Sequence, residues 1–181
     1  MRLQGIVSIL DQQHVQIVEN LWAEMRTQLG IAPPDATTVP HVSYHVAESY
    51  DEAKVIDVLR EAATQERPFT INATGIGIFP APNPIIYVPV VRSLYLTQLH
   101  AKLFPRLSAT ALNNNAYYAP KAWIPHITLG HSDISIEQLG TLTQWLHQQA
   151  INWTITIDNF YLLTDDTQRL VQEFRVTFGN Q

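Results

Sequence analysis

Two short stretches of the chain each present a histidine and a hydroxyl residue two positions apart. His41 is followed by Ser43, and His126 is followed by Thr128. Each pair comes directly after a proline and sits among β-branched or aromatic residues, which predicts the start of a strand. Residues two apart on a strand point to the same face. Each strand therefore offers one imidazole and one hydroxyl side by side.

This set of groups fits the hydrolysis of a phosphodiester. A neutral histidine can take a proton from a nucleophile while a protonated one gives a proton to a leaving group. The hydroxyls can donate hydrogen bonds to oxygens that carry negative charge. In a phosphodiester, water attacks phosphorus on one side while an alkoxide leaves on the other. Two facing pairs could perform both transfers, and the scheme requires no metal ion and no cofactor.

The composition restricts the alternatives. The chain has 181 residues, which suits one domain covering 1–181, with 46% hydrophobic and 15% charged residues. It has no cysteine, which excludes disulfides, thiol nucleophiles and thiolate metal sites. The net charge of −5 argues against binding to duplex DNA, although a small phosphate pocket needs only a few local donors. No apolar run reaches membrane-spanning length, so we expect a cytoplasmic protein without membrane contact. The sequence does not indicate the oligomeric state, and a monomer is assumed.

Apolar periodicity predicts a regular series of strands and helices. Helices are expected from caps at Asp11, at Ser49 or Asp51, at Ser93 and at Ser135, each followed by an apolar stripe. The segment from 108 to 125 reads as an irregular loop. The strands are expected at 3–10, 39–46, 69–79, 85–91, 123–130, 153–163 and 169–178.

This order of elements occurs twice, with offsets of 82 to 85 residues between matching elements. The repeats cover about 3–80 and 85–163, and a closing strand follows at 169–178. The two histidine strands occupy the same place in each repeat. We therefore expect an α+β fold that is bilobal, with two antiparallel sheets related by a pseudo-two-fold duplication. The helices should lie outside, and the central cleft should carry both histidine motifs.

The motifs and their spacing resemble those of the two-histidine phosphoesterases, the family that includes 2′-5′ RNA ligases and RNA 2′,3′-cyclic phosphodiesterases. The family signature is a pair of His-x-Thr/Ser-x motifs roughly 80 residues apart. Here the matches are His41-Val42-Ser43-Tyr44 and, more closely, His126-Ile127-Thr128-Leu129. The resemblance spans nearly the whole chain. It departs at His131, where many RNA-acting members carry a basic residue that is often arginine.

The resemblance implies that His41 and His126 are catalytic and that Ser43 and Thr128 bind phosphate. For the opening of a cyclic phosphate it implies His126 as base and His41 as acid, an assignment that the symmetry of the sequence leaves open. The substrate class would be a 2′,3′-cyclic phosphate on an RNA end or a small nucleotide, with 2′-5′ RNA ligation as the related activity.

Further residues are secondary candidates for substrate binding. Tyr118 and Lys121 lie in the loop before the second motif, where they could meet a base and a phosphate or simply pack. His45 is expected on the same face as His41, at the rim of the cleft or in solvent. It is about 13 Å along the strand from His41, too far to share a metal ion. Gly75 and Gly77 lack the pattern of a nucleotide fingerprint and indicate a strand kink or bulge.

The sequence thus predicts a metal-independent phosphodiesterase that uses two histidines as acid and base. A non-catalytic nucleotide or RNA-end binding module that retains the pocket is the alternative. A zinc hydrolase is a third reading, and it lacks a local cluster of ligands in the sequence.

Overall fold

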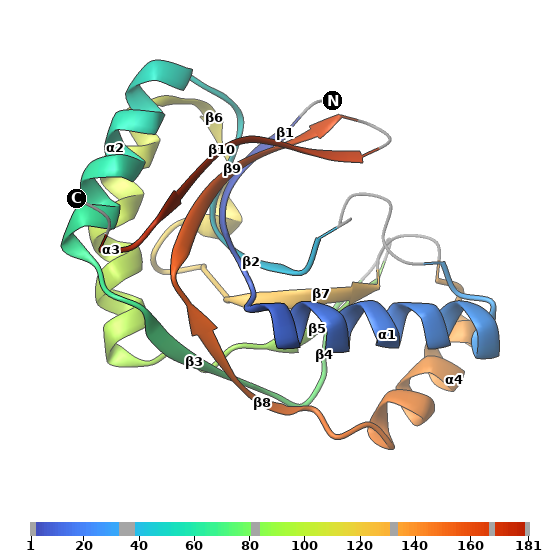
Figure 1. The fold of residues 1–181 in the computed structure, drawn as a ribbon. Coiled ribbons are helices and arrows are strands. Elements are labelled where there is room, and N and C mark those ends of the chain that lie inside the picture. The colour runs from blue at the N-terminus through green and yellow to red at the C-terminus, as the bar shows by residue number, and fades with distance from the viewer. Residues whose placement is uncertain (1–2, 33–38, 81–83, 131–133, 167–168, 180–181) are drawn as a thin grey trace.

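The computed structural model describes residues 3–32, 39–80, 84–130, 134–166 and 169–179. In this part of the chain the fold is mixed α+β, with antiparallel strands and four α-helices (Figure 1). None of the helices described is long and apolar enough to cross a membrane. The helices are α1 (Gln12–Leu29), α2 (Glu52–Gln65), α3 (Leu94–Ser108) and α4 (Ile136–His147), with one 3₁₀ turn, η1 (Ala116–Tyr118).

The helices begin where the local sequence predicts. Asp11, Asp51, Ser93 and Ser135 each accept a hydrogen bond from the backbone N–H three residues on, which satisfies a donor that the first helical turn leaves free. At Ser135 the Gln138 side chain also bonds back to the cap residue, which completes a capping box. These caps set the points at which the chain leaves each strand and turns outward.

The strands form three hydrogen-bonded sheets, all antiparallel. The largest has the order β10-β9-β1-β2-β6, the second pairs β3 with β8, and the third has the order β4-β5-β7. A single bridge between Ala73 and Val90 joins the second and third sheets. The strand bounds are β1 (Leu3–Ile9), β2 (His41–Tyr50), β3 (Phe69–Thr74), β4 (Gly77–Phe79), β5 (Ile85–Pro89), β6 (Ala111–Asn114), β7 (His126–Gly130), β8 (Asn152–Ile157), β9 (Asn159–Asp166) and β10 (Arg169–Thr177).

Three sheets replace the expected two because two long strands are broken. The strand expected at 69–79 ends at Thr74, since Gly75 adopts a positive φ of 72° that turns the chain into β4. The strand expected at 153–163 is interrupted at Asp158, where the chain passes from β8, paired with β3, to β9, paired with β1. The loop expected at 108–125 also contains a short strand, β6, on the edge beside β2.

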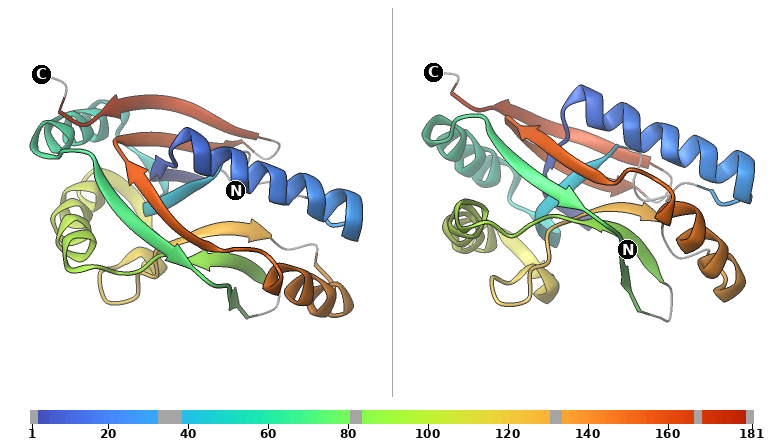
Figure 2. Two further views of the ribbon diagram at one scale, coloured as in Figure 1. Left: turned by 60° about the horizontal axis from the view of Figure 1, so that its bottom comes forward. Right: turned by 90° about the horizontal axis from the view of Figure 1, so that it is seen from below.

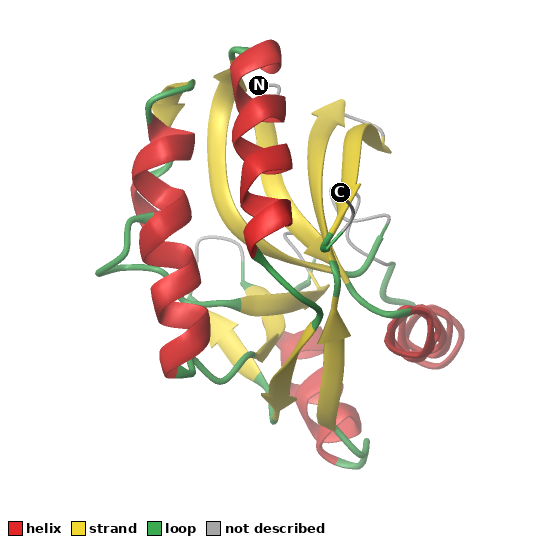
Figure 3. Cartoon of the chain, turned by 60° about the vertical axis from the view of Figure 1, so that its left-hand side comes forward, coloured by secondary structure: helices red, strands yellow, loops and turns green. Residues whose placement is uncertain are grey.

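The helices cover the outer faces of the sheets in two pairs. α2 contacts β9 and β10, while α3 contacts β2 and β6. Figure 3 shows α2 and α3 side by side in front of the strands. On the other side α1 and α4 contact each other, and Trp22 of α1 donates a hydrogen bond to the Leu129 carbonyl of β7. β3 and β8 run together between the two helix pairs (Figure 2).

β2 and β7 belong to different sheets and contact each other near the centre of the molecule, where Figure 1 shows one above the other. The residues between the motif positions point away from this contact into the core. Val42, Tyr44, Ile127 and Leu129 are each at most 1% exposed. The opposite faces of the two strands therefore carry the histidines and hydroxyls.

Candidate active site

The two motif strands have the same register against their neighbours. In the β1–β2 pair, His41 lies opposite Ile9 and Ser43 opposite Val7. In the β5–β7 pair, the corresponding partners are His126 with Pro89 and Thr128 with Tyr87. Both ladders then shift by one residue, because Tyr44 in β2 and Leu129 in β7 are the extra residues of β-bulges.

This equivalence of two ladders supports the internal duplication, which itself stays a prediction. It extends to the other strands, since β1 pairs with β9 as β5 pairs with β4. The bulge follows each histidine by three residues, so each motif occupies the last regular stretch before its strand bends. The two imidazoles therefore start from the same local backbone arrangement.

Each histidine is oriented by the same hydrogen bond. His41 Nδ1 lies 2.7 Å from the carbonyl oxygen of Val39, and His126 Nδ1 lies 2.7 Å from that of Ile124. A carbonyl oxygen can only accept, so each Nδ1 carries the proton and donates it. In a neutral imidazole this leaves Nε2 as a free acceptor, and in the protonated form Nε2 becomes a donor. In both histidines, Nε2 is therefore the ring atom that can take up or release a proton.

Burial keeps both imidazoles neutral at ordinary pH. It lowers the pKa of His41 to about 4, against an opposing effect of the Val39 carbonyl. The charge of a protonated His126 lowers the pKa of His41 further, so the two rings are within electrostatic reach of each other. Burial also lowers the pKa of His126, and the Ile124 carbonyl opposes this. An anion bound between the rings would raise both pKa values, because it favours the imidazolium form.

The hydroxyls lie on the same strand faces as the imidazoles. Ser43 and Thr128 are both half-buried. Burial raises the pKa of Tyr118, and a hydrogen bond with the Ser43 side chain partly opposes that rise. This bond places the Tyr118 hydroxyl beside the first motif. Of the secondary candidates, Tyr118 therefore reaches the site, as part of η1.

Trp123 connects the two motif strands. Its indole Nε1 donates a hydrogen bond of 2.9 Å to the Ser43 carbonyl of β2, while its own backbone lies three residues before His126. The indole is 2% exposed and stacks on the His100 ring, with centroids 3.9 Å apart and planes 6° apart. The Arg92 guanidinium lies over the same indole and donates to the Trp123 carbonyl at 3.2 Å. Trp123 is therefore a packing residue that holds β7 against β2.

His45 does not line the site, contrary to the expectation from strand alternation. The bulge at Tyr44 reverses the alternation, so His45 points to the helix-covered face and is fully buried. Its Nδ1 lies 2.6 Å from the Tyr50 hydroxyl, and its Nε2 lies 3.1 Å from the Ser108 hydroxyl of α3. Both ring nitrogens have partners, so His45 has a structural role and the expectation that it binds substrate was wrong.

The described part of the structure does not show the other two candidates, Lys121 and His131, beside the two motifs. Lys121 is exposed in the turn before β7, and none of its described contacts brings it to the two motifs. His131 lies outside the described residues. Within the described ranges, no group of three or more His, Cys, Asp or Glu side chains is arranged to hold a metal ion.

Sequence reasoning missed two aromatic residues beside His126. The rings of Phe79 and Tyr87 have their centroids 5.0 and 5.2 Å from the His126 ring, in edge-to-face orientations. Tyr87 lies directly opposite Thr128 in the neighbouring strand. Alternation in the strand expected at 85–91, combined with antiparallel pairing to the motif strand, would have indicated Tyr87.

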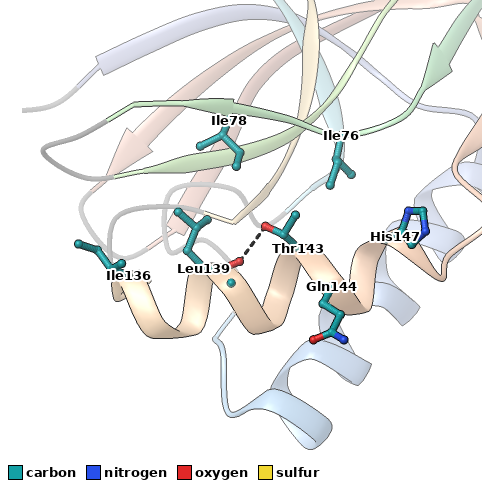
Figure 4. A pocket seen from close by; sticks show the side chains of 8 residues that line it. Ile76, Ile78, Ile136, Leu139, Thr143, Gln144 and His147 are labelled. Carbon is teal, nitrogen blue, oxygen red and sulfur yellow. Dashed lines mark hydrogen bonds between the residues drawn. The ribbon is translucent and has the colours of Figure 1, made fainter.

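A surface pocket of about 670 Å³ is separate from this site. It lies between β4 and α4, where Figure 4 shows Ile76 and Ile78 facing the helix. Gly77 and Phe79, which alternate with these isoleucines, belong to the opposite face of β4 beside Tyr87 and His126. The remaining lining is provided by Ile136, Leu139, Gly140, Thr143, Gln144 and His147.

Known proteins resemble the chain in sequence and in fold. Residues 14–169 match the 2′-5′ RNA ligase superfamily. A protein of Bacillus cereus (strain AH820) named "Putative phosphoesterase" is 26% identical over 157 residues, covering 82% of this chain and 85% of that protein. TT0787 of Thermus thermophilus shares the fold with a TM-score of 0.68 and 14% identity, covering 100% of both chains. LigT of Escherichia coli, crystallised with 3′-AMP, has a TM-score of 0.62 at 14% identity, covering 99% of both chains.

Proposed function

The chain belongs to the 2′-5′ RNA ligase superfamily, and from this premise we propose that it is a metal-independent phosphodiesterase. Its substrate is a 2′,3′-cyclic phosphate, on an RNA end or on a small nucleotide. The observation that carries the proposal is the matched pair of Nδ1–carbonyl bonds at His41 and His126, which leaves both Nε2 atoms free for proton transfer. The 3′-AMP in the LigT crystal structure supports a nucleotide as ligand for this fold.

In the proposed reaction, His126 acts as the base and His41 as the acid. The neutral Nε2 of His126 takes a proton from water, whose oxygen forms a bond to phosphorus. The bond between phosphorus and one ribose oxygen breaks, and the protonated Nε2 of His41 gives its proton to that oxygen. The product is a phosphomonoester on the other ribose oxygen. The Ser43 and Thr128 hydroxyls donate hydrogen bonds to the non-bridging oxygens as charge grows on them.

The environment of the histidines supports these roles. A base must be neutral before it acts, and burial of His126 favours the neutral form. The acid must be protonated although burial lowers the pKa of His41 to about 4. The bound phosphodiester raises the pKa of His41 again, because its negative charge next to Nε2 stabilises the imidazolium. The substrate thus helps to charge the group that protonates its leaving oxygen.

A substrate panel in the presence of EDTA tests the proposal. It contains 2′,3′-cyclic mononucleotides, RNA with a cyclic phosphate end, 2′-5′ dinucleotides and ADP-ribose cyclic phosphate. We expect turnover of at least one cyclic phosphate by the wild type, unchanged by the chelator, and loss of it in His126→Gln. Activity that EDTA abolishes and zinc or manganese restores would refute the metal-independent mechanism. Tight binding of 3′-AMP without any turnover would identify a binding module instead.

A further inference from the structure

Gly77 of β4 provides the space for the ring of Tyr87. A Cβ atom built on Gly77 would lie 2.4 Å from Tyr87 Cζ, 2.5 Å from Cε2 and 2.7 Å from the hydroxyl oxygen. Distances this short mean that any side chain at position 77 must displace the ring. Gly77 is not among the glycines with positive φ, so the requirement is for space and not for an unusual backbone conformation.

The ring that Gly77 accommodates is packed against His126. Phe79 stacks on Tyr87 with centroids 4.1 Å apart and planes 22° apart. Both rings then meet the imidazole in edge-to-face contacts, at 5.0 Å for Phe79 and 5.2 Å for Tyr87. Such contacts have preferred geometry and restrict how the partner ring can turn. His126 is thus held at Nδ1 by the Ile124 carbonyl and along its side by two aromatic rings.

The first motif has a different neighbour in the equivalent place. Val7 lies opposite Ser43 on β1, where Tyr87 lies opposite Thr128 on β5. Among the described side chains, no aromatic ring packs against His41 as Phe79 and Tyr87 pack against His126. The two histidines share their hydrogen bond and differ in their packing. The motifs themselves do not cause this difference, which comes from Tyr87 on β5 and Phe79 on β4.

We propose that Tyr87, which packs against Gly77 and stacks on Phe79, is a positioning residue that fixes the rotation of the His126 imidazole. The torsion about the Cβ–Cγ bond of histidine has a broad minimum, so one hydrogen bond at Nδ1 leaves the ring room to swing. The packed Tyr87 ring blocks rotation of the imidazole towards one side. Proton transfer depends steeply on the alignment of Nε2 with the attacking water, so a fixed ring raises kcat.

The inference rests on the proposed function, and four variants test it on a cyclic mononucleotide. Tyr87→Phe keeps the ring and should behave as wild type. Tyr87→Val reproduces the side chain of Val7 and should lower kcat by roughly 10- to 100-fold, with a much smaller change in KM. Gly77→Ala should lower kcat similarly, because its Cβ displaces the ring. In the Tyr87→Val background, Gly77→Ala should cost little more, since the atoms it would strike are absent.

Gly140→Ala is the matched control for adding a methyl group. Gly140 lies in α4, where a Cβ would meet nothing within 4 Å, and this variant should keep wild-type kcat. A second readout is independent of catalysis. In ¹⁵N and ¹³C NMR spectra, the His126 ring should change tautomer ratio and titrate at higher pH in Tyr87→Val, because the imidazole is then freer and better solvated.

The two readouts separate failure of the inference from failure of the proposed function. If the wild type turns over no member of the panel, the function is wrong, and the NMR titration of His126 alone decides the role of Tyr87. Wild-type kcat and an unchanged His126 titration in Tyr87→Val would overturn the inference. Equal losses from Gly77→Ala in both backgrounds would show that Gly77 acts through something other than Tyr87 and would also overturn it.

Discussion

The indole Nε1 of Trp123 donates a hydrogen bond of 2.9 Å to the carbonyl oxygen of Ser43, and this bond joins the segment before one motif to the strand of the other. β2 and β7 belong to different sheets, so no ladder of backbone hydrogen bonds sets their separation. The buried indole, stacked on His100, performs this task. The spacing of the two histidines therefore depends on a side chain outside both motifs.

Trp123→Phe should destabilise the protein markedly. It leaves the Ser43 carbonyl without its donor and opens space beside His100, which together cost roughly 2–4 kcal/mol. The free energy of unfolding in urea is the measurement. Trp145→Phe is the control, because its Nε1 bonds to Gln28 at the surface and its loss should cost far less. Equal destabilisation by the two variants would mean that the Trp123–Ser43 bond has no special role.

Local signals predicted most of the fold. The caps at Asp11, Ser93 and Ser135 act within one helical turn, so the residues that form them lie together in the sequence. The break after Thr74 occurs at Gly75, whose φ is positive and where the sequence had indicated a kink or bulge. The interruption at Asp158 was not predicted, because it depends on β8 and β9 pairing with two different distant strands, β3 and β1.

The site shows the same division. The faces of His41 and His126 follow from alternation, because both precede the bulges in their strands. His45 follows a bulge, and alternation placed it on the wrong face. The aromatic contacts of His126 involve residues far away in the sequence, Phe79 and Tyr87. The Tyr87 ring also needs the space above Gly77, and only the folded structure shows that this glycine lies against that ring.

The pH dependence of kcat/KM should be displaced to the acid side. Burial lowers the pKa of both motif histidines, that of His41 to about 4. The acid must be protonated in the free enzyme, and this form is lost as pH rises through its lowered pKa. The bell-shaped profile, whose limbs belong to the coupled pair, should therefore have its maximum below about pH 6.5.

The profile of kcat provides the comparison. The bound phosphodiester favours the imidazolium, so the limbs of kcat should lie at higher pH than those of kcat/KM. Initial rates at constant ionic strength over the acid and neutral range measure both profiles. A kcat/KM that keeps rising through about pH 8 would be incompatible with an acid held in so buried a position.

Loss of either hydroxyl should weaken catalysis moderately. In the proposed reaction Ser43→Ala and Thr128→Ala each remove one charge-assisted hydrogen bond to the phosphate, which should cost about 1.5–3 kcal/mol or roughly 10- to 150-fold in kcat/KM. Thr128→Ser keeps the hydroxyl and should retain most of the activity. Steady-state kinetics with one cyclic nucleotide compare the three variants. If an alanine variant equals the wild type, that hydroxyl does not touch the reacting phosphate.

His45 should make the protein sensitive to acid. Burial lowers its pKa to about 4, and the charge of His100 adds to this, whereas the unfolded chain titrates near 6.5. Below about pH 6.5 the unfolded state therefore binds the proton more readily than the folded state. The stability contributed by neutral His45 is complete above about pH 6.5 and is lost as pH falls towards 4, by up to roughly 3 kcal/mol.

His45→Gln tests this linkage. The amide can still hydrogen-bond to Tyr50 or Ser108 but does not titrate. The variant should be less stable than the wild type at about pH 8, and its stability should decline less steeply between about pH 6.5 and 4. Urea unfolding at a series of pH values gives both slopes. Parallel slopes would show that His45 does not titrate as its burial requires.

Removing either motif histidine should abolish most of the catalysis to which both contribute. In the proposed reaction each transfers one proton in the same step, so His41→Ala and His126→Ala should each lower kcat/KM by roughly 10²- to 10⁴-fold. Once one transfer is lost, the double variant should be little worse than the more damaged single one, because groups that act as a unit are not additive. His147→Ala, on the exposed side of α4, is the control for losing an imidazole and should be silent. The measurement is a double-mutant cycle on kcat/KM, beside binding of 3′-AMP to each variant. Losses that multiply would mean that the histidines act in separate steps, and full activity in either single variant would refute the paired mechanism.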